Sequence, residues 1–92
     1  MILCAGEALI DMLPRETPDG PGFLPVPGGA VFNTAIALGR LDAPVALHTG
    51  LSSDLFGQRL AETLAQSKVE NRAHISDRPT TLAFVTLTDG QA

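Results

Sequence analysis

The sequence has few basic residues, a single cysteine and no long apolar run. Six lysines and arginines stand against ten aspartates and glutamates, which leaves a formal charge of −4 over 92 residues. Nucleic acids and anionic membranes attract basic patches, so we expect neither as a partner. The apolar runs fall far short of the ~20 residues that a membrane-spanning helix needs. Cys4 cannot form an intrachain disulfide, which fits a reducing compartment, and we expect a cytoplasmic protein.

Several common ligand-binding and catalytic motifs are also missing. Lys68 is the sole lysine and follows no glycine, so there is no Walker-type phosphate loop. No G-x-G-x-x-G segment opens a helix, which argues against dinucleotide binding. His48 and His74 are far apart and do not form a metal-ligand cluster with the one cysteine, and no Gly-x-Ser-x-Gly motif occurs.

Short apolar runs alternate with helical patterns along the chain. A content of 45% hydrophobic and 17% charged residues is typical of a globular domain. The order predicts an α/β unit with parallel strands and right-handed crossovers. The elements we expect are strands at 2–5 and 8–13, a helix at 30–41, a strand at 45–49, a helix at 55–67 capped by Asp54, and strands at 72–75 and 80–88.

Two stretches interrupt this pattern. Five of the seven prolines lie between residues 14 and 27, and that density excludes a helix. We expect a turn and a short edge strand at 23–26 instead. Near the end of the chain, a β-rich run leads into Asp89-Gly90, which is a strong hairpin signal with no returning strand after it. We therefore expect these residues to be the N-terminal portion of a longer polypeptide.

One group of residues suggests a binding site. Gly28-Gly29 open the first helix, Asn33 lies one turn into it, and Asp11 lies in an early apolar run. Paired glycines let a backbone approach a ligand closely, and a carboxylate with an amide suits a polyhydroxylated ligand such as a sugar. Each residue also has a plain structural interpretation: a turn cap or ion pair for Asp11, and an ordinary helix start for the others.

Three further residues stay ambiguous on the sequence alone. His48, between apolar neighbours, favours a buried structural histidine over a catalyst. Glu7 fits either a buried structural carboxylate or a site residue. Phe84 fits the core of a strand better than a pocket.

In sequence order, several segments resemble the ribokinase-like (pfkB) family of carbohydrate kinases, and within it the bacterial fructokinases. Val31, Asp42 and Ser52 depart from the residues usual in that family. The matching segments are Gly6-Glu7-Ala8-Leu9-Ile10-Asp11, Gly28-Gly29-x-x-x-Asn33-x-Ala35, Leu38-Gly39-Arg40-Leu41, Asp54-Leu55-Phe56-Gly57 and Arg78-Pro79-Thr80-Thr81-Leu82-Ala83-Phe84-Val85.

The resemblance implies an α/β fold: the N-terminal part of a ribokinase-like (Rossmann-like) three-layer α/β/α sandwich with a small β lid. Residues 1–92 would form the sugar-binding part, with lid segments near 12–27 and 72–92. The ATP-binding and catalytic part, with its Gly-Ala-Gly-Asp motif, has no counterpart in this sequence.

The same resemblance implies that the whole enzyme uses ATP and Mg²⁺ to phosphorylate a sugar, with fructose the first expectation. Asp11 and Asn33 would bind sugar hydroxyls, Gly28 and Gly29 would close against the sugar, and Phe84 is a further candidate. No catalytic, ATP-binding or metal-binding residue is assigned in this chain, so the 92 residues alone are expected to be inactive. A homodimer through the lid is also implied. The alternatives are a kinase for 2-keto-3-deoxygluconate or ribose, and a non-catalytic sugar-binding module.

Overall fold

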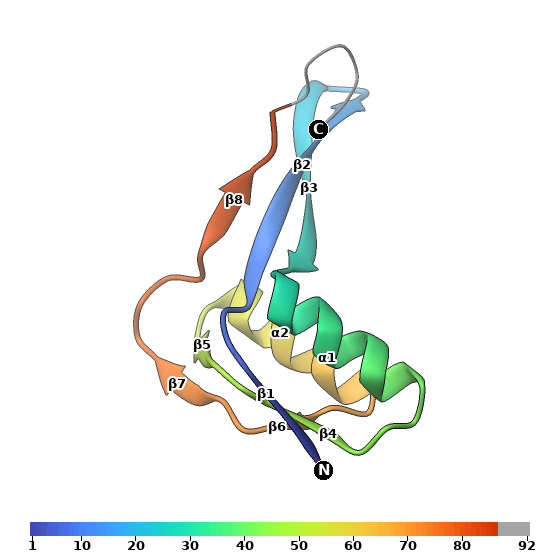
Figure 1. The fold of residues 1–92 in the computed structure, drawn as a ribbon. Helices are drawn as coiled ribbons and strands as arrows, with labels where there is room; N and C mark the ends of the chain where they lie inside the picture. Colours follow the sequence, from blue (N-terminus) through green and yellow to red (C-terminus); the bar gives the residue numbers. More distant parts are fainter. Residues whose placement is uncertain (87–92) are drawn as a thin grey trace.

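The computed structural model describes residues 1–86 as an α/β body from which a long hairpin projects (Figure 1). The body contains a parallel sheet in the order β1-β4-β6 and two helices. Strand order and right-handed crossovers place both helices on one face of this sheet. Its elements are β1 (Ile2–Ala5), α1 (Ala30–Arg40), β4 (Val45–His48), α2 (Leu55–Gln66) and β6 (Glu70–Asn71).

The core lies between the sheet and the two helices. Val45 and Leu47 alternate along β4 and both face the helices, where they are almost fully buried. Both helices are amphipathic, and their core-facing residues are Phe32, Ala35 and Ile36 on α1 and Leu60 and Leu64 on α2. The described residues thus form two layers of the expected three-layer sandwich, because the other face of the sheet carries no helix within residues 1–86.

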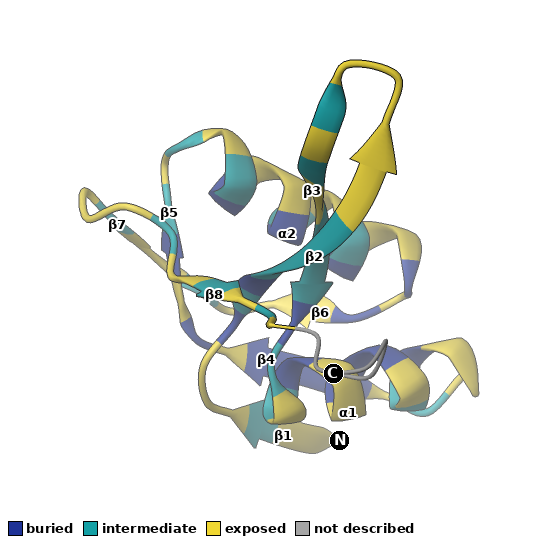
Figure 2. Cartoon of the chain, turned by 90° about the horizontal axis from the view of Figure 1, so that it is seen from above, coloured by how far each residue is buried: buried dark blue, intermediate teal, exposed yellow. Residues whose placement is uncertain are grey.

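The hairpin comprises β2 (Leu9–Thr17) and β3 (Gly20–Gly28), paired antiparallel over nine positions. It is much longer than the short edge strand predicted at 23–26. β3 is an edge strand, and the positions of its prolines, 21, 25 and 27, differ from one another by even numbers. Backbone N–H groups alternate in direction along a strand, so all three missing donors face outward and none is lost from the pairing with β2. Figure 2 shows that exposure increases toward the hairpin tip.

β8 (Leu82–Phe84) runs parallel to β2 and completes a three-stranded sheet in the order β3-β2-β8. This sheet is named the lid sheet below, after the lid expected from the sequence. A separate parallel pair, β5 (Gly50–Ser52) and β7 (His74–Ser76), lies beside the body. Both predicted helices are confirmed to within one residue at their ends. The strands predicted at 72–75 and 80–88 are shifted or shortened, β6 was not predicted, and the hairpin signal at Asp89-Gly90 lies outside the described residues.

Neither helix is long and apolar enough to span a lipid bilayer, within the part of the chain that the structure describes.

Candidate functional site

The glycine pair at the junction of β3 and α1 is required by its geometry. Gly29 has a φ of 106°, and a Cβ there would lie 2.8 Å from the carbonyl oxygen of Glu7. Its own carbonyl accepts the first hydrogen bond of α1, from the Asn33 N–H at 2.9 Å. No side chain caps this helix, so the N–H groups of its first turn stay available to water or a ligand.

Asp11 lies directly over Gly28. Asp11 pairs with Val26 across the hairpin, and Gly28, two residues further along β3, therefore points to the same face. A Cβ on Gly28 would collide with the Asp11 Oδ2 and lie 3.2 Å from its Cγ. The carboxylate thus fills the space that the missing side chain leaves, and the sequence-predicted residues Asp11, Gly28 and Gly29 come together with Asn33 one helical turn away.

The side chains of Asp11 and Asn33 make no hydrogen bond to other described residues and can therefore bond to a ligand. Within residues 1–86, no side-chain hydrogen bond involves Asp11 or Asn33. The salt bridges in this part of the chain join other residues. Asp11 is half-buried and Asn33 is exposed. Neither the turn cap nor the ion pair considered for Asp11 is therefore present among the described residues.

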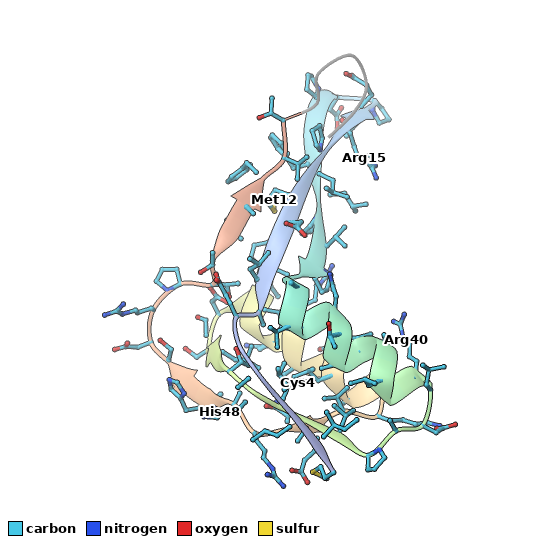
Figure 3. The ribbon with its side chains drawn as sticks, in the orientation of Figure 1. Cys4, Met12, Arg15, Arg40 and His48 are labelled. Carbon is cyan, nitrogen blue, oxygen red and sulfur yellow. The ribbon has the colours of Figure 1, made fainter. Side chains whose placement is uncertain are left out.

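Phe84 does not belong to this cluster. The register of β2 and β8 places Ala83 beside Asp11 and Phe84 beside Met12, on the other face of the lid sheet. There the Phe84 ring stacks edge-on against Phe23, with centroids 5.1 Å apart and planes at 87°. Met12 is labelled on β2 in Figure 3. Alternation along β8 puts Ala83 and Phe84 on opposite faces, but only the register with β2 shows that Ala83 shares the face of Asp11.

His48 and Glu7 also differ from expectation. His48 is exposed, so the prediction of a buried histidine is wrong. It ends β4 on the face turned away from the helices, since Val45 and Leu47 take the alternate positions that point into the core. Glu7 is exposed as well, which removes its interpretation as a buried structural carboxylate.

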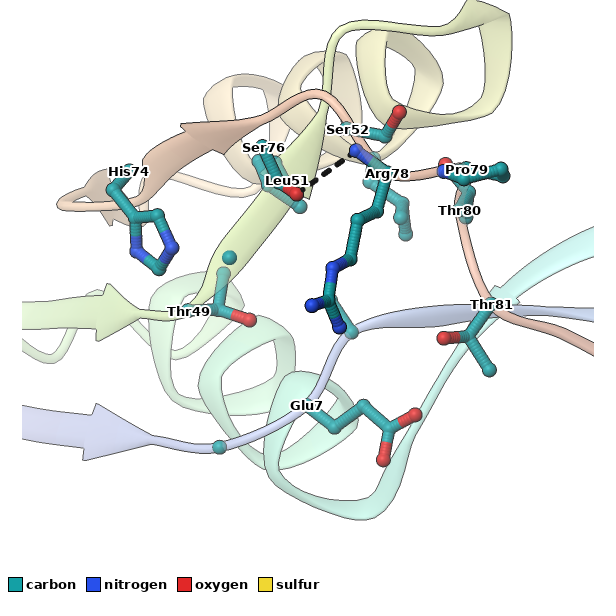
Figure 4. Close-up of a pocket in the computed structure, with 14 residues that line it drawn as sticks. Glu7, Thr49, Leu51, Ser52, His74, Ser76, Arg78, Pro79, Thr80 and Thr81 are labelled. Atoms are coloured by element: carbon teal, nitrogen blue, oxygen red, sulfur yellow. Dashed lines mark hydrogen bonds between the residues drawn. The ribbon is translucent and has the colours of Figure 1, made fainter.

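A hollow of about 270 Å³ lies near the carboxyl ends of β1, β4 and β5 (Figure 4). Its walls are polar and apolar in similar measure, and none of the predicted substrate-binding residues lines it. It nevertheless adjoins the cluster around Asp11, because Glu7 and Ala8, which line it, lie against Gly29. Its polar lining includes Glu7, Thr49, Ser52, His74, Arg78 and Thr80.

Asp54 does more than the predicted helix capping. Its Oδ1 accepts a hydrogen bond from the Gly57 N–H at 2.8 Å, which confirms the N-cap. The same carboxylate also accepts the N–H and hydroxyl of Thr80, and these bonds lower the pKa of Asp54 to about 2. The pKa lies below its ordinary value near 3.8, so this stabilisation is complete above about pH 4 and disappears as the pH falls toward 2.

The described residues provide no evident metal site. Among residues 1–86, no three histidine, cysteine, aspartate or glutamate side chains lie close enough to hold an ion. The cluster around Asp11 offers one carboxylate, one amide and bare backbone. This set suits hydrogen bonding to neutral hydroxyl groups better than metal coordination.

Comparisons with known proteins place this fold in a family. Residues 1–92 match the family described as "pfkB family carbohydrate kinase". A fructokinase of Rhizobium leguminosarum bv. trifolii is 58% identical over 94 residues, covering 100% of this chain and 29% of that protein. The crystal structure of fructokinase from Xylella fastidiosa has a TM-score of 0.87 at 40% identity, covering 98% of this chain and 30% of the other.

A second solved structure is similar at lower identity. Fructokinase from Vibrio cholerae O395, in its fructose-, ADP- and calcium-bound form, has a TM-score of 0.82 at 28% identity and covers 94% of this chain and 28% of the other. The chain spans about three-tenths of the length of the curated relatives it matches.

Proposed function

The chain belongs to the pfkB family of carbohydrate kinases, and we propose that it forms the sugar-binding and lid portion of an ATP-dependent fructokinase. The observation that carries this proposal is the Asp11 carboxylate, half-buried over Gly28 and free of hydrogen bonds within residues 1–86. A carboxylate in that setting accepts hydroxyl donors strongly. Curated relatives that match 99% or more of the chain, including one 58% identical to it, are named fructokinase or probable fructokinase.

In this proposal the sugar lies against the bare backbone of Gly28 and Gly29. Two sugar hydroxyls donate to Asp11, and the Asn33 amide supplies a donor and an acceptor at the start of α1. The lid sheet of β2, β3 and β8 covers the sugar and limits the access of water. Positioning and water exclusion are what phosphoryl transfer requires from this part of a kinase.

Nucleotide and metal binding belong to the whole enzyme in this proposal. A structure of the Xylella fructokinase contains ATP, and the Vibrio structure contains ADP and calcium. We propose ATP and Mg²⁺ for the enzyme of which this chain forms part. Residues 1–86 do not fit either group, since they include no phosphate-binding Gly-Lys loop and no carboxylate cluster. We therefore propose that the residues that bind ATP and Mg²⁺ lie in the part of the enzyme that corresponds to the unmatched length of the relatives. We also propose that the enzyme is cytoplasmic.

A hybrid enzyme tests the sugar assignment. Residues 1–92 replace the matching segment of the Rhizobium fructokinase, which supplies the remaining seven-tenths of the length. We expect the purified hybrid to phosphorylate fructose with ATP at a higher kcat/KM than ribose or 2-keto-3-deoxygluconate, whereas the 92-residue chain alone shows no transfer. A coupled kinase assay measures both. A folded hybrid that prefers ribose or ketodeoxygluconate would contradict the fructose assignment, and one that binds fructose without transfer would support the non-catalytic alternative.

We also propose that a second copy of the chain docks on the lid. Phe23 and Phe84 stack on one another yet stay 51% and 60% exposed, with Leu82 beside them at 39%. Exposed stacked aromatics on one sheet face are typical of an interface.

Phe84→Glu is therefore expected to shift the protein from dimer to monomer in sedimentation velocity experiments. Leu41→Glu is the matched control, because Leu41 is 78% exposed at the end of α1, on the body. A wild-type protein that sediments as a monomer at all concentrations, or a Phe84→Glu variant that stays dimeric, would rule out this interface.

A further inference from the structure

The segment that joins the body to the lid is fixed at several successive points. β7 ends at Ser76, whose hydroxyl accepts the Arg78 N–H at 3.1 Å (Figure 4). Pro79 follows and restricts the backbone further, because its φ is fixed by the ring. The next residue, Thr80, is the last one before the lid strand pairs with β2. The chain therefore enters the lid through a short, constrained crossing.

Asp54 holds Thr80 by two hydrogen bonds. The Asp54 Oδ2 accepts the Thr80 N–H at 2.8 Å, and Oδ1 accepts the Thr80 hydroxyl at 2.5 Å. The two residues are 26 positions apart in the sequence, so the contact joins α2 to the lid entrance. Together with the bond from Gly57, the carboxylate accepts three donors, and a carboxylate so surrounded stays ionised well into acid.

Several contacts hold Asp54 and its neighbours against β5 and β7. Its N–H donates to the Ser52 hydroxyl at 3.1 Å, at the end of β5. Gly57, one turn into α2, packs so closely that a Cβ there would overlap the Ser52 carbonyl oxygen. The neighbouring Ser53 N–H donates to the carbonyl of Ser76 at 3.2 Å, across the β5–β7 pair. Asp54 is therefore anchored to the same body elements from which the crossing segment departs.

Just beyond Thr80, the chain pairs with β2 beside the cluster around Asp11. The Thr81 carbonyl accepts the Ile10 N–H at 3.0 Å, one residue before Asp11. Ala83 then lies beside Asp11 in the register, and the Val85 N–H donates to the Met12 carbonyl at 3.1 Å. Only Thr81 and Leu82 separate Thr80 from Ala83, the residue beside Asp11. A shift at Thr80 is thus transmitted to the pairing that flanks the carboxylate.

We propose that Asp54 is a positioning residue for the sugar site: by holding Thr80, it sets where the chain enters the lid and keeps β8 paired with β2 beside Asp11. The statement about the sugar rests on the proposed function, whereas the statement about β8 does not. Asp54 touches no reacting group in this scheme and acts only through Thr80.

Paired variants separate this role from helix capping. Asp54→Asn keeps the cap of α2, since asparagine caps helices as well as aspartate, but its amide nitrogen cannot accept the Thr80 N–H. Thr80→Val removes the hydroxyl bond, and Thr80→Ser restores it. The matched controls are Asp42→Asn, at an exposed ion pair with Lys68, and Thr63→Val, whose hydroxyl bonds within α2.

Hydrogen exchange of backbone amides is the first readout, measured on the chain itself. In Asp54→Asn, we expect the Ile10 and Val85 amides to exchange about tenfold faster, while the β4 amides keep their wild-type rates. Thr80→Val shows a smaller increase, and Thr80→Ser and both controls match the wild type. Unchanged exchange at Ile10 and Val85, or an equal increase in β4, overturns the proposal, because the second result reports general destabilisation.

Kinetics of the hybrid enzyme give the second readout. Asp54→Asn is expected to raise KM for fructose about tenfold with kcat within about twofold, and Thr80→Ser to restore KM relative to Thr80→Val. A loss of kcat without a change in KM overturns the positioning role. If the unmutated hybrid fails to phosphorylate fructose, the proposed function fails, and the exchange experiment alone decides whether Asp54 positions β8.

Discussion

Replacing Asp11 with alanine is expected to lower kcat/KM for fructose by about 100-fold or more in the hybrid enzyme. The carboxylate lies over Gly28 with no hydrogen bond from residues 1–86, so its acceptors are available to sugar hydroxyls. Without the carboxylate, buried hydroxyls of the bound sugar have no hydrogen-bond partner. An unpaired buried hydroxyl costs far more free energy of binding than one that stays in contact with water. Steady-state kinetics and calorimetric titration with fructose measure the effect.

Three companion variants sharpen this experiment. Asp11→Asn keeps the shape and loses the charge, and we expect an intermediate defect. Asp19→Asn is the matched control, because Asp19 lies exposed at the turn of the same hairpin. Gly28→Ala places a Cβ where the Asp11 carboxylate lies, so it should impair fructose binding without removing any polar group. Wild-type affinity in Asp11→Ala would contradict the location of the sugar site.

The second large effect is expected at Gly57. An alanine normally stabilises a helix interior by up to about 1 kcal/mol relative to glycine. At Gly57 the added Cβ would overlap the Ser52 carbonyl oxygen and lie 2.6 Å from the carbonyl carbon, both of them backbone atoms. The start of α2 must then move away from β5, and we expect Gly57→Ala to lower the free energy of unfolding by about 3 kcal/mol.

Urea denaturation followed by circular dichroism measures this loss. Gln66→Ala serves as the control in the same helix, since Gln66 is exposed at its last position. The control should stay within about 0.5 kcal/mol of the wild type. A Gly57→Ala midpoint at or above that of the wild type would show that α2 does not pack directly on β5.

The helices were predictable from the sequence because their signals are local. A 3.6-residue apolar period gives each helix, Asp54 marks the start of the second, and Gly28-Gly29 precede the first. Apart from Asp11, which is far away in the sequence, the candidate site was proposed from a local signal too, since paired glycines beside a helix start indicate a close backbone approach. These signals involve residues within one or two helical turns of each other.

The errors concern relations between distant segments. The length of the hairpin was underestimated because a high density of prolines normally argues against a long strand. Here the prolines of β3 are spaced so that the N–H groups they lack would all point away from β2, and the pairing is not interrupted. The sequence could not show which residue of β8 lies beside Asp11, because the β2–β8 register is set by tertiary pairing. The bond between Asp54 and Thr80 joins residues 26 positions apart, and no local pattern indicates it. His48 was misplaced because apolar neighbours do not reveal which face of a strand is covered.

The even spacing of prolines along β3 has a consequence for how the lid meets other molecules. An incoming strand needs a row of outward N–H and C=O groups to extend a sheet. Between residues 21 and 27, Phe23 alone presents an outward N–H, since the other outward positions are prolines. The outer edge of the lid therefore resists backbone pairing and the aggregation that follows from it, which leaves the side-chain face around Phe23 and Phe84 as the surface open to specific association.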